Sequence, residues 1–313
     1  MEYKYLFGPV PSRRLGISLG IDLVPLKTCS YNCIYCECGK TTNLTIERKE
    51  YFPVCDIIAE IDDFLRDKPH LDYITYSGSG EPTLHTGILE ITEHIKNNYP
   101  EYKIALLTNA SLFWDKKVRE ECMGMDVVIP SLDAASELSF KKIDRPHSAL
   151  KASCVNEGLI KFCEEFLGEI RLEIFIVPGI NDTLTEIEGM NEIIKKIKPA
   201  KVQLNTLDRP GAVSWIKPAD DESLMRISSL LSHDNVEITK KPAERVLSGA
   251  YSGDVSELIL QTIKRRPCTL KDISEITSLH RNEVNKYLGV LAEMDLIYES
   301  RGERGVFYSA KNS

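Results

Sequence analysis

Short apolar runs alternate with longer amphipathic stretches between about residue 16 and residue 240. The runs predict strands at residues 17–23, 73–77, 104–108, 127–132, 170–177 and 202–205, with a possible seventh at residues 236–239. Helical spacing is clearest at residues 54–66 and at residues 185–197, which stop before Pro199. Strands separated by helices are typical of βα units on a parallel sheet. We therefore predict an α/β fold, a partial (β/α)6-type barrel whose chemistry lies at the carboxyl ends of the strands.

The pattern changes after a Gly/Ser-containing connector at residues 241–253. Residues 255–263, 270–276 and 282–294 have helical spacing, and Thr269 is available as the N-cap of the second helix. Two short strands, at residues 296–300 and 306–309, then flank the polar tip Arg-Gly-Glu-Arg-Gly. This order of elements is the layout of a winged helix-turn-helix. We predict two domains, a barrel over residues 1–245 and a winged helix-turn-helix over residues 254–313.

Composition narrows the class of protein. Apolar residues make up 42% of the 313 residues and charged residues 27%, which is typical of a folded globular chain. There is no run of eighteen apolar residues and no basic-then-apolar N-terminus, so we expect a cytoplasmic protein without a membrane partner. The net charge of −8 excludes a basic coat over the whole surface. Nine cysteines in such a chain favour metal or redox chemistry over disulfides.

Three of these cysteines, Cys29, Cys33 and Cys36, form a C-x3-C-x2-C pattern directly after the first predicted strand. Three thiolates within eight residues can converge on one face of an iron–sulfur cubane. A structural zinc site usually takes two separated pairs of ligands, and no second C-x2-C pair exists here. Cys38 could add a fourth ligand and close the site. Three ligands instead leave one iron open to a small molecule, and this is the interpretation we favour.

The pattern C-x3-C-x-aromatic-C at this place in a βα series resembles the radical S-adenosylmethionine (SAM) superfamily. The resemblance implies a [4Fe–4S] cluster on the three cysteines, with SAM bound to the open iron. It implies reductive cleavage of SAM to methionine and a 5′-deoxyadenosyl radical, with an electron donor such as ferredoxin or flavodoxin. Tyr35, the aromatic residue before the last cysteine, would pack near the adenine of SAM. The alternative interpretation is that Tyr35 packs in the hydrophobic core.

Further polar segments follow the later strands and would complete a SAM site. Ser79-Gly80-Glu81 resembles the superfamily's Gly-Gly-Glu segment, which holds the methionine amino group, although Ser79 replaces the first glycine. Ser131 and Asp133 suit the SAM carboxylate and the ribose hydroxyls. The remaining candidates at strand ends are Asn109, Asn181 and Asn205. Each of these residues alone could equally form a turn or cap a helix. Their shared location at the carboxyl ends of strands is what favours a common SAM site.

A narrower resemblance covers roughly residues 5–210. The stretch Phe7-Gly-Pro-Val-Pro-Ser-Arg-Arg-Leu-Gly16 is similar to a group of radical SAM proteins related to the wyosine-forming tRNA enzymes, the 4-demethylwyosine synthases. Those enzymes carry additional N-terminal cysteines for a second cluster, whereas no cysteine precedes Cys29 here. We therefore take the resemblance to indicate common descent and not a shared substrate. Arg13 and Arg14 in this stretch could meet an anionic substrate or remain solvated surface charges.

The likeness leaves three functions open. The leading one is a radical enzyme that modifies a macromolecule, either RNA or protein, which the winged helix recruits. The winged helix is neutral, because its nine Lys/Arg residues balance nine Asp/Glu residues. Modest contact with phosphate would come from the start of the third helix, at Arg281, Asn282, Asn285 and Lys286, and from Arg301 and Arg304 in the wing. The second is an activase that makes a glycyl radical on a partner protein. The third is a redox-sensing transcription regulator. No catalytic acid or base stands out.

Overall fold

The large domain is built on one eight-stranded sheet. The fold comes from a computed structural model that describes residues 3–12, 14–78, 80–239, 255–277, 279 and 281–311. The strands are β1 (Leu6–Ser12), β2 (Gly16–Ile21), β5 (Tyr73–Tyr76), β6 (Ile104–Thr108), β7 (Val127–Pro130), β8 (Glu169–Phe175), β9 (Lys201–Asn205) and β10 (Val236–Ile238). They lie in this order across the sheet, and every neighbouring pair is parallel except β1–β2. The predicted α/β class and all seven predicted strands are confirmed.

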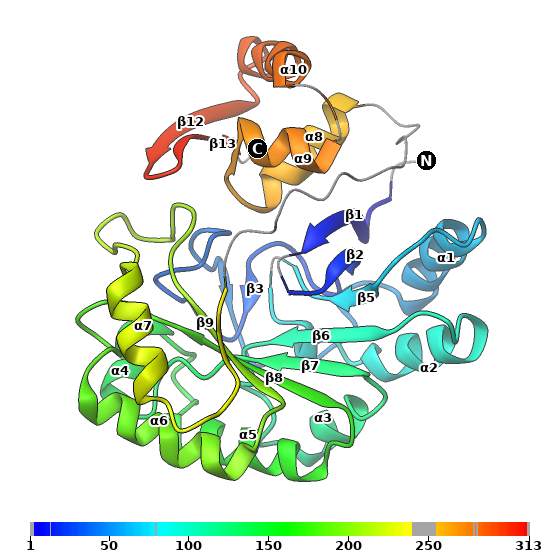
Figure 1. The fold of residues 1–313 in the computed structure, drawn as a ribbon. Coiled ribbons are helices and arrows are strands. Elements are labelled where there is room, and N and C mark those ends of the chain that lie inside the picture. Colours follow the sequence, from blue (N-terminus) through cyan, green and yellow to red (C-terminus); the bar gives the residue numbers. More distant parts are fainter. Residues whose placement is uncertain are drawn as a thin grey trace.

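Helices follow the strands and cover the outer face of the sheet (Figure 1). They are α1 (Val54–Leu65), α2 (Ile88–Asn98), α3 (Lys116–Glu121), α4 (Glu137–Ile143), α5 (Ala152–Glu165), α6 (Leu184–Ile197) and α7 (Asp221–Leu230), with a 3-10 turn η1 at Pro82–Leu84. The helix α6 begins at an N-cap, Thr183, whose side chain accepts a hydrogen bond from the Glu186 N–H. A small two-stranded pair, β3 (Thr28–Cys29) and β4 (Asn43–Leu44), closes the loop after β2.

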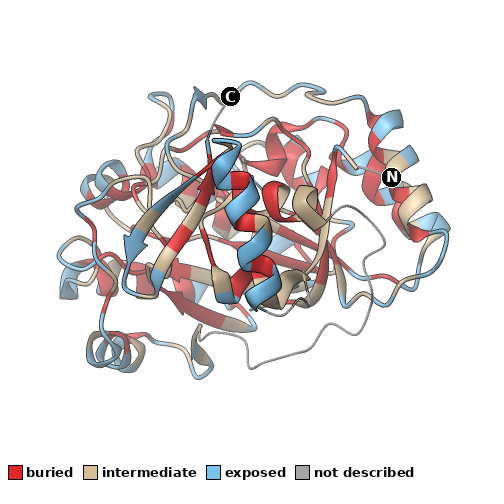
Figure 2. Ribbon diagram, turned by 90° about the horizontal axis from the view of Figure 1, so that it is seen from above, coloured by how far each residue is buried: buried red, intermediate tan, exposed pale blue. Residues whose placement is uncertain are grey.

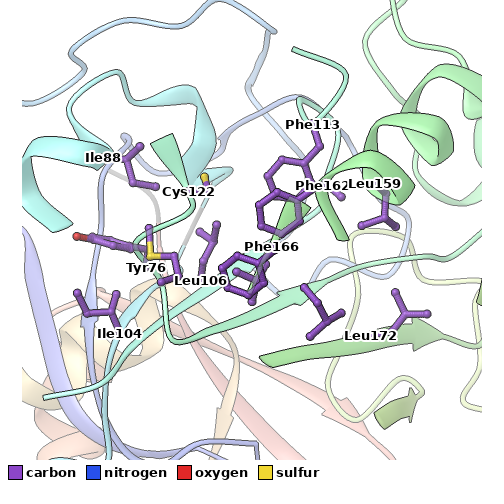
Figure 3. Close-up of a cluster of buried hydrophobic side chains, with 14 of the residues drawn as sticks. Tyr76, Ile88, Ile104, Leu106, Phe113, Cys122, Leu159, Phe162, Phe166 and Leu172 are labelled. Carbon is purple, nitrogen blue, oxygen red and sulfur yellow. The ribbon is translucent and has the colours of Figure 1, made fainter. Parts of the chain in front are cut away.

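The main hydrophobic core lies between the sheet and these helices. Figure 2 shows buried residues on the inward faces of the helices and exposed residues on their outward faces. Part of this core is drawn in Figure 3, where the rings of Phe113 and Phe162 stack with centroids 4.0 Å apart. Tyr76, Leu106 and Leu172 reach the same core from β5, β6 and β8. Alternate residues of those strands face the opposite side of the sheet, which is where the site lies.

The C-terminal domain has its own core and a three-stranded sheet. Its elements are α8 (Val255–Arg265), β11 (Cys268–Thr269), α9 (Leu270–Thr277), α10 (Arg281–Glu293), β12 (Ile297–Gly302) and β13 (Gly305–Ala310). The predicted cap is confirmed, because the Thr269 hydroxyl accepts from the Asp272 N–H at 3.2 Å and the Asp272 carboxylate accepts from the Thr269 N–H at 2.9 Å. The predicted three helices and hairpin are all present. The boundary between the two domains, at residues 245–254, lies outside the described residues.

Ion pairs of arginine side chains join the C-terminal domain to the large domain. Arg209, which follows β9, lies 3.1 Å from the Glu37 carboxylate and 3.7 Å from that of Asp272 in α9. Arg304, from the turn between β12 and β13, pairs with both Asp272 and Asp208. Since Glu37 belongs to the cysteine loop, the C-terminal domain is docked beside that loop.

Candidate functional site

The cysteine loop starts at β3 and lies at the carboxyl edge of the parallel sheet. Its backbone is fixed to the end of α4, because the Ile34 N–H donates to the Ile143 carbonyl at 2.9 Å and the Asn32 N–H donates to the Asp144 carbonyl at 2.9 Å. Within the loop, the Cys36 N–H donates to the Cys33 carbonyl at 3.2 Å. This bond closes a turn between the second and third predicted ligands.

The three thiols have different surroundings. Asn109, after β6, donates its amide N–H toward Cys29 Sγ at 3.5 Å, and burial raises the pKa of this thiol to about 12. Cys33 Sγ lies 3.6 Å from Oδ1 of Asp144. Burial, then Asp144 and the two other thiols, raise the pKa of Cys33 well above its usual value. Burial is the first cause of the raised pKa at both Cys29 and Cys33, so both thiols lie in low-dielectric surroundings.

Cys36 is the thiol most ready to ionise. A hydrogen bond with Cys38 lowers its pKa to about 6, against the opposing effect of burial and with the help of the Lys27 ammonium. Lys27 is buried, with its Nζ 3.6 Å from Cys36 Sγ and bonded to the Gly39 carbonyl. Since the thiolate is the form of cysteine that ligates metals, the surroundings of Cys36 favour the form that a metal ligand requires.

The spacing of the thiols bears on what they hold. No group of three or more histidine, cysteine, aspartate or glutamate side chains within the described residues is arranged to hold a metal ion. The three thiols of the loop are nevertheless the donor set that a [4Fe–4S] cluster takes, and they come from one short segment of the chain.

The segment after β5 packs directly against the start of the cysteine loop. A Cβ on Gly80 would lie 2.1 Å from the Thr28 carbonyl oxygen, so only glycine fits there. Glu81 is 2% exposed, and its carboxylate accepts from the hydroxyls of Thr83 and Thr108 and from the Asn109 N–H, at 2.6, 2.6 and 2.8 Å. Burial raises the pKa of Glu81, and these hydrogen bonds oppose the rise. Glu81 therefore ties the ends of β5 and β6 together.

A second set of contacts centres on Tyr35. Its ring stacks on Phe175 at the end of β8, with centroids 3.9 Å apart and planes 10° apart. The Tyr35 hydroxyl donates to Oδ2 of Asp133, and the Phe175 N–H donates to Oδ1 at 2.7 Å. Burial raises the pKa of Asp133 from 3.8 to about 7, against these hydrogen bonds. The cysteine loop is thus locked to the ends of β7 and β8.

The other predicted residues divide by what they contact. Asn181 is fully buried, and its amide donates to the carbonyls of Asp133 and Phe175 at 2.9 and 2.7 Å while accepting from the Val177 N–H. Asn205 accepts from the N–H of its neighbour at 3.0 Å. Ser131 is half-buried and bridges to Glu173 of β8. Ser79 lies outside the described residues.

The sequence of the region also matches known proteins. The profile of the radical SAM superfamily matches residues 23–192, more than half of the chain, and this segment contains all three cysteines of the loop. The chain belongs to the radical SAM superfamily. Members of this superfamily are enzymes that use a [4Fe–4S] cluster and SAM.

Individual relatives extend over different shares of the chain. The UPF0026 protein MJ1312 of Methanocaldococcus jannaschii is 36% identical over 90% of this chain and 85% of its own length. GTPase Obg of Brachyspira hyodysenteriae is 35% identical over 96% of this chain, but the chain spans only 44% of that protein. A probable dual-specificity RNA methyltransferase, RlmN of Cytophaga hutchinsonii, is 24% identical over 56% of this chain and 49% of its length.

The solved structures support the same fold. A radical SAM methyltransferase of Sphaerobacter thermophilus superposes with a TM-score of 0.53 at 16% identity, over 72% of this chain and 65% of that one. At this identity the likeness shows the fold alone. Within the described residues, none of the helices has the length and apolar character needed to cross a membrane.

Sequence reasoning missed two residues beside the thiols, Lys27 and Asp144. Lys27 lies two residues before Cys29, and this nearness was an available signal. Asp144 is more than a hundred residues away along the chain and reaches Cys33 only because α4 ends against the loop. Nothing in the sequence pattern marks such a contact.

Proposed function

We propose that the chain cleaves SAM reductively at a cluster held by Cys29, Cys33 and Cys36, and uses the resulting radical to modify a nucleotide of an RNA. The observation that carries the proposal is the position of the three thiols. They lie together at the carboxyl edge of a parallel sheet in a chain of the radical SAM superfamily. With Cys38 hydrogen-bonded to Cys36, we assign that thiol a supporting part, and one iron is left open for SAM.

The chain's own residues would hold and orient SAM. A bound cluster would supply the one-electron reduction that cleaves SAM to methionine and a 5′-deoxyadenosyl radical, with the electron taken from a donor such as ferredoxin or flavodoxin. Tyr35, with Phe175 behind it, offers an aromatic surface for the adenine. Asp133 and Ser131 lie near that surface with oxygen atoms suited to the ribose hydroxyls and to the amino-acid end of SAM.

Other predicted residues support the site from behind. Gly80-Glu81 would present main-chain groups to the methionine amino group, while the Glu81 carboxylate holds the segment in place. Asn109 positions Cys29. Asn181 and Asn205 are engaged with neighbouring backbone, so we propose that they shape the strand ends.

RNA is the macromolecule that the observations favour. One relative carries the name of an RNA methyltransferase. The C-terminal domain, which we propose to be a winged helix, exposes Arg281 and Lys286 at the start of α10 and Arg301 in the hairpin. Arg304, by contrast, is tied to Asp208 and Asp272. By descent we place the chain with the 4-demethylwyosine synthase-like proteins.

The test is RNA-dependent turnover by the anaerobically reconstituted protein. Given SAM and a low-potential reductant, it should form 5′-deoxyadenosine slowly alone and faster with RNA from a strain that lacks the gene, and that RNA should gain a modified nucleoside by mass spectrometry. Stimulation by a protein fraction instead of RNA, with an EPR-visible radical on a protein, would replace this proposal with the activase. A reconstituted protein that forms no 5′-deoxyadenosine under any condition refutes the chemistry.

A further inference from the structure

The inner face of the sheet, opposite the helices, has an apolar half and a polar half. On β6 and β7 it carries Ala105, Val127 and Ile129, packed around Leu15. On β8 and β9 the outer-face residues Leu172, Ile174, Val202 and Leu204 join the main core. The alternate residues Glu173 and Gln203 therefore face inward, on the same side as Phe175. Barrel interiors are normally filled by bulky apolar side chains, so the polar half needs an explanation.

Strand register places these polar residues in one row. Glu173 of β8 pairs with Gln203 of β9, which pairs in turn with Glu237 of β10. On the other side, Glu173 bridges to Ser131 after β7. The next inward-facing residues, toward the carboxyl ends, include Phe175, which stacks on Tyr35 of the cysteine loop. The row thus lies one layer beneath the proposed SAM site.

The row contains buried polar atoms that are not satisfied within the protein. Gln203 is 3% exposed; its Nε2 donates to Glu237 at 3.2 Å, but its Oε1 is buried without a hydrogen-bond partner. Arg14 pairs with Glu173 through Nη2, yet its Nε is also buried and without a partner. Such atoms cost stability, and most buried polar groups in proteins have a partner in the protein, in water or in a ligand.

The chemistry of the row selects among ligands. Gln203 Oε1 is an acceptor and Arg14 Nε is a donor, while the Arg14 charge is already balanced by Glu173. A locally neutral pair does not provide the excess positive charge that a phosphate requires. A neutral planar group with both donors and acceptors on its edge fits better, and a nucleobase is such a group.

We propose that Arg14, Glu173 and Gln203 recognise the base of the nucleotide that is modified. This inference rests on the proposed RNA substrate and adds the residues that select the base. It places the base beneath SAM, on the polar half of the inner face, and leaves the apolar half to pack the barrel.

The test measures binding of the four ribonucleoside 5′-monophosphates to the full-length reconstituted protein with saturating SAM, by isothermal titration calorimetry. SAM keeps adenosine groups out of its own site. One base should bind about tenfold or more tightly than the rest, since a lost hydrogen-bonding pair discriminates by about that factor. Gln203→Met, which keeps the length of the side chain, should abolish this preference.

Stability distinguishes a recognition role from a structural one. If Oε1 of Gln203 awaits a ligand, Gln203→Met removes an unsatisfied atom, and its melting temperature without ligand should equal or exceed that of the wild type. The matched control is Asn191→Leu. The buried Asn191 amide lies on the outer helix α6 with both ends bonded, to the Leu230 carbonyl and the Ser232 N–H, so this variant should melt lower and keep the base preference.

The outcomes separate this inference from the proposed function. Equal binding of all four nucleotides, or no binding, in a protein whose 5′-deoxyadenosine formation responds to RNA, overturns the base-recognition row and leaves the RNA function standing. A base preference lost in Gln203→Met, without any response to RNA, supports the row and makes a free nucleotide the substrate. If the protein shows no base preference and no response to RNA, both the base-recognition row and the proposed RNA function are wrong. A base preference that survives in Gln203→Met also overturns the inference.

Discussion

The cysteine loop and the C-terminal domain differ in what their sequences reveal. The loop spans only a few residues, yet three thiols at fixed spacing specify a reagent, because few ligand sets hold a [4Fe–4S] cluster. The C-terminal domain is several times longer, and its hydrophobic periodicity gave every helix and the hairpin, but periodicity specifies shape and not partner. Chemistry is encoded in few residue types at fixed spacing, whereas recognition depends on surfaces assembled from distant residues.

The first and largest prediction concerns the loss of one thiol from the cysteine loop. Cys33→Ala should abolish both the cluster and 5′-deoxyadenosine formation, because two remaining cysteines do not hold the cubane. Visible absorbance, iron content and product analysis measure the effect. The exposed Cys154 is the matched control, and Cys154→Ala should retain all three signals. Retained SAM cleavage in Cys33→Ala would refute the ligand assignment.

The second prediction concerns the join between the regions. Arg209→Met removes the cation that lies between Glu37 and Asp272, while Asp272 keeps Arg304, so the free energy of unfolding should fall by about 2 kcal/mol. Protease cleavage between the domains should increase as well. Arg119 is equally buried but pairs with Glu165 inside the large domain, so Arg119→Met should lower stability without promoting that cleavage. Identical cleavage patterns in both variants would show that Arg209 does not hold the domains together.

The third prediction tests the partner of the C-terminal domain. Reversing two exposed charges, Arg281→Glu with Lys286→Glu, should weaken RNA binding about tenfold at low salt and reduce the dependence of affinity on salt. The effect is read by fluorescence anisotropy with labelled RNA. Unchanged affinity and salt dependence would mean that α10 does not contact RNA.

The fourth prediction concerns Lys27. Its ammonium beside Cys36 would stabilise the added negative charge of a reduced cluster held there, so Lys27→Met should make the midpoint potential of the cluster more negative. An EPR-monitored redox titration measures this. Lys40, an exposed lysine of the same loop, provides the control, and Lys40→Met should leave the potential nearly unchanged. An equal shift in both variants would argue against a specific effect of Lys27.

The smallest expected effect is on pH dependence. Burial raises the Asp133 pKa from 3.8 to about 7, so the folded protein binds this proton more tightly than the unfolded chain does. The stability this group contributes is full below about pH 4 and is lost as the pH rises through about 7. Asp133→Asn cannot titrate, so its melting temperature without SAM should fall less between about pH 5 and pH 8 than that of the wild type. Parallel slopes in the two proteins would contradict the shifted pKa.

The sequence predicted the parallel sheet well because buried strands are continuous apolar runs. It missed β1, an antiparallel edge strand whose Pro9 and Pro11 hide its strand character; proline is tolerated at such an edge. It also missed Glu173. The charged residues at every second position of β8, Glu169, Arg171 and Glu173, were an available signal that one face of that strand is polar.

The site was predictable only in part. Backbone position could be inferred for every strand end, but side-chain direction could not. Glu81 and Asn181 do lie at strand ends, yet their polar atoms are used by neighbouring backbone and hydroxyl groups. Contacts such as Asp144 with Cys33 depend on tertiary packing between distant segments. Residue type and spacing do not carry that information.

The most direct test of the central claim is the EPR spectrum of the reduced, reconstituted cluster before and after SAM is added. Three cysteine ligands leave one iron open, so SAM should bind it and change the g-values of the signal. A spectrum that SAM does not alter, from a protein with full iron content, would mean that a fourth protein ligand such as Cys38 closes the cluster. That result would contradict the account.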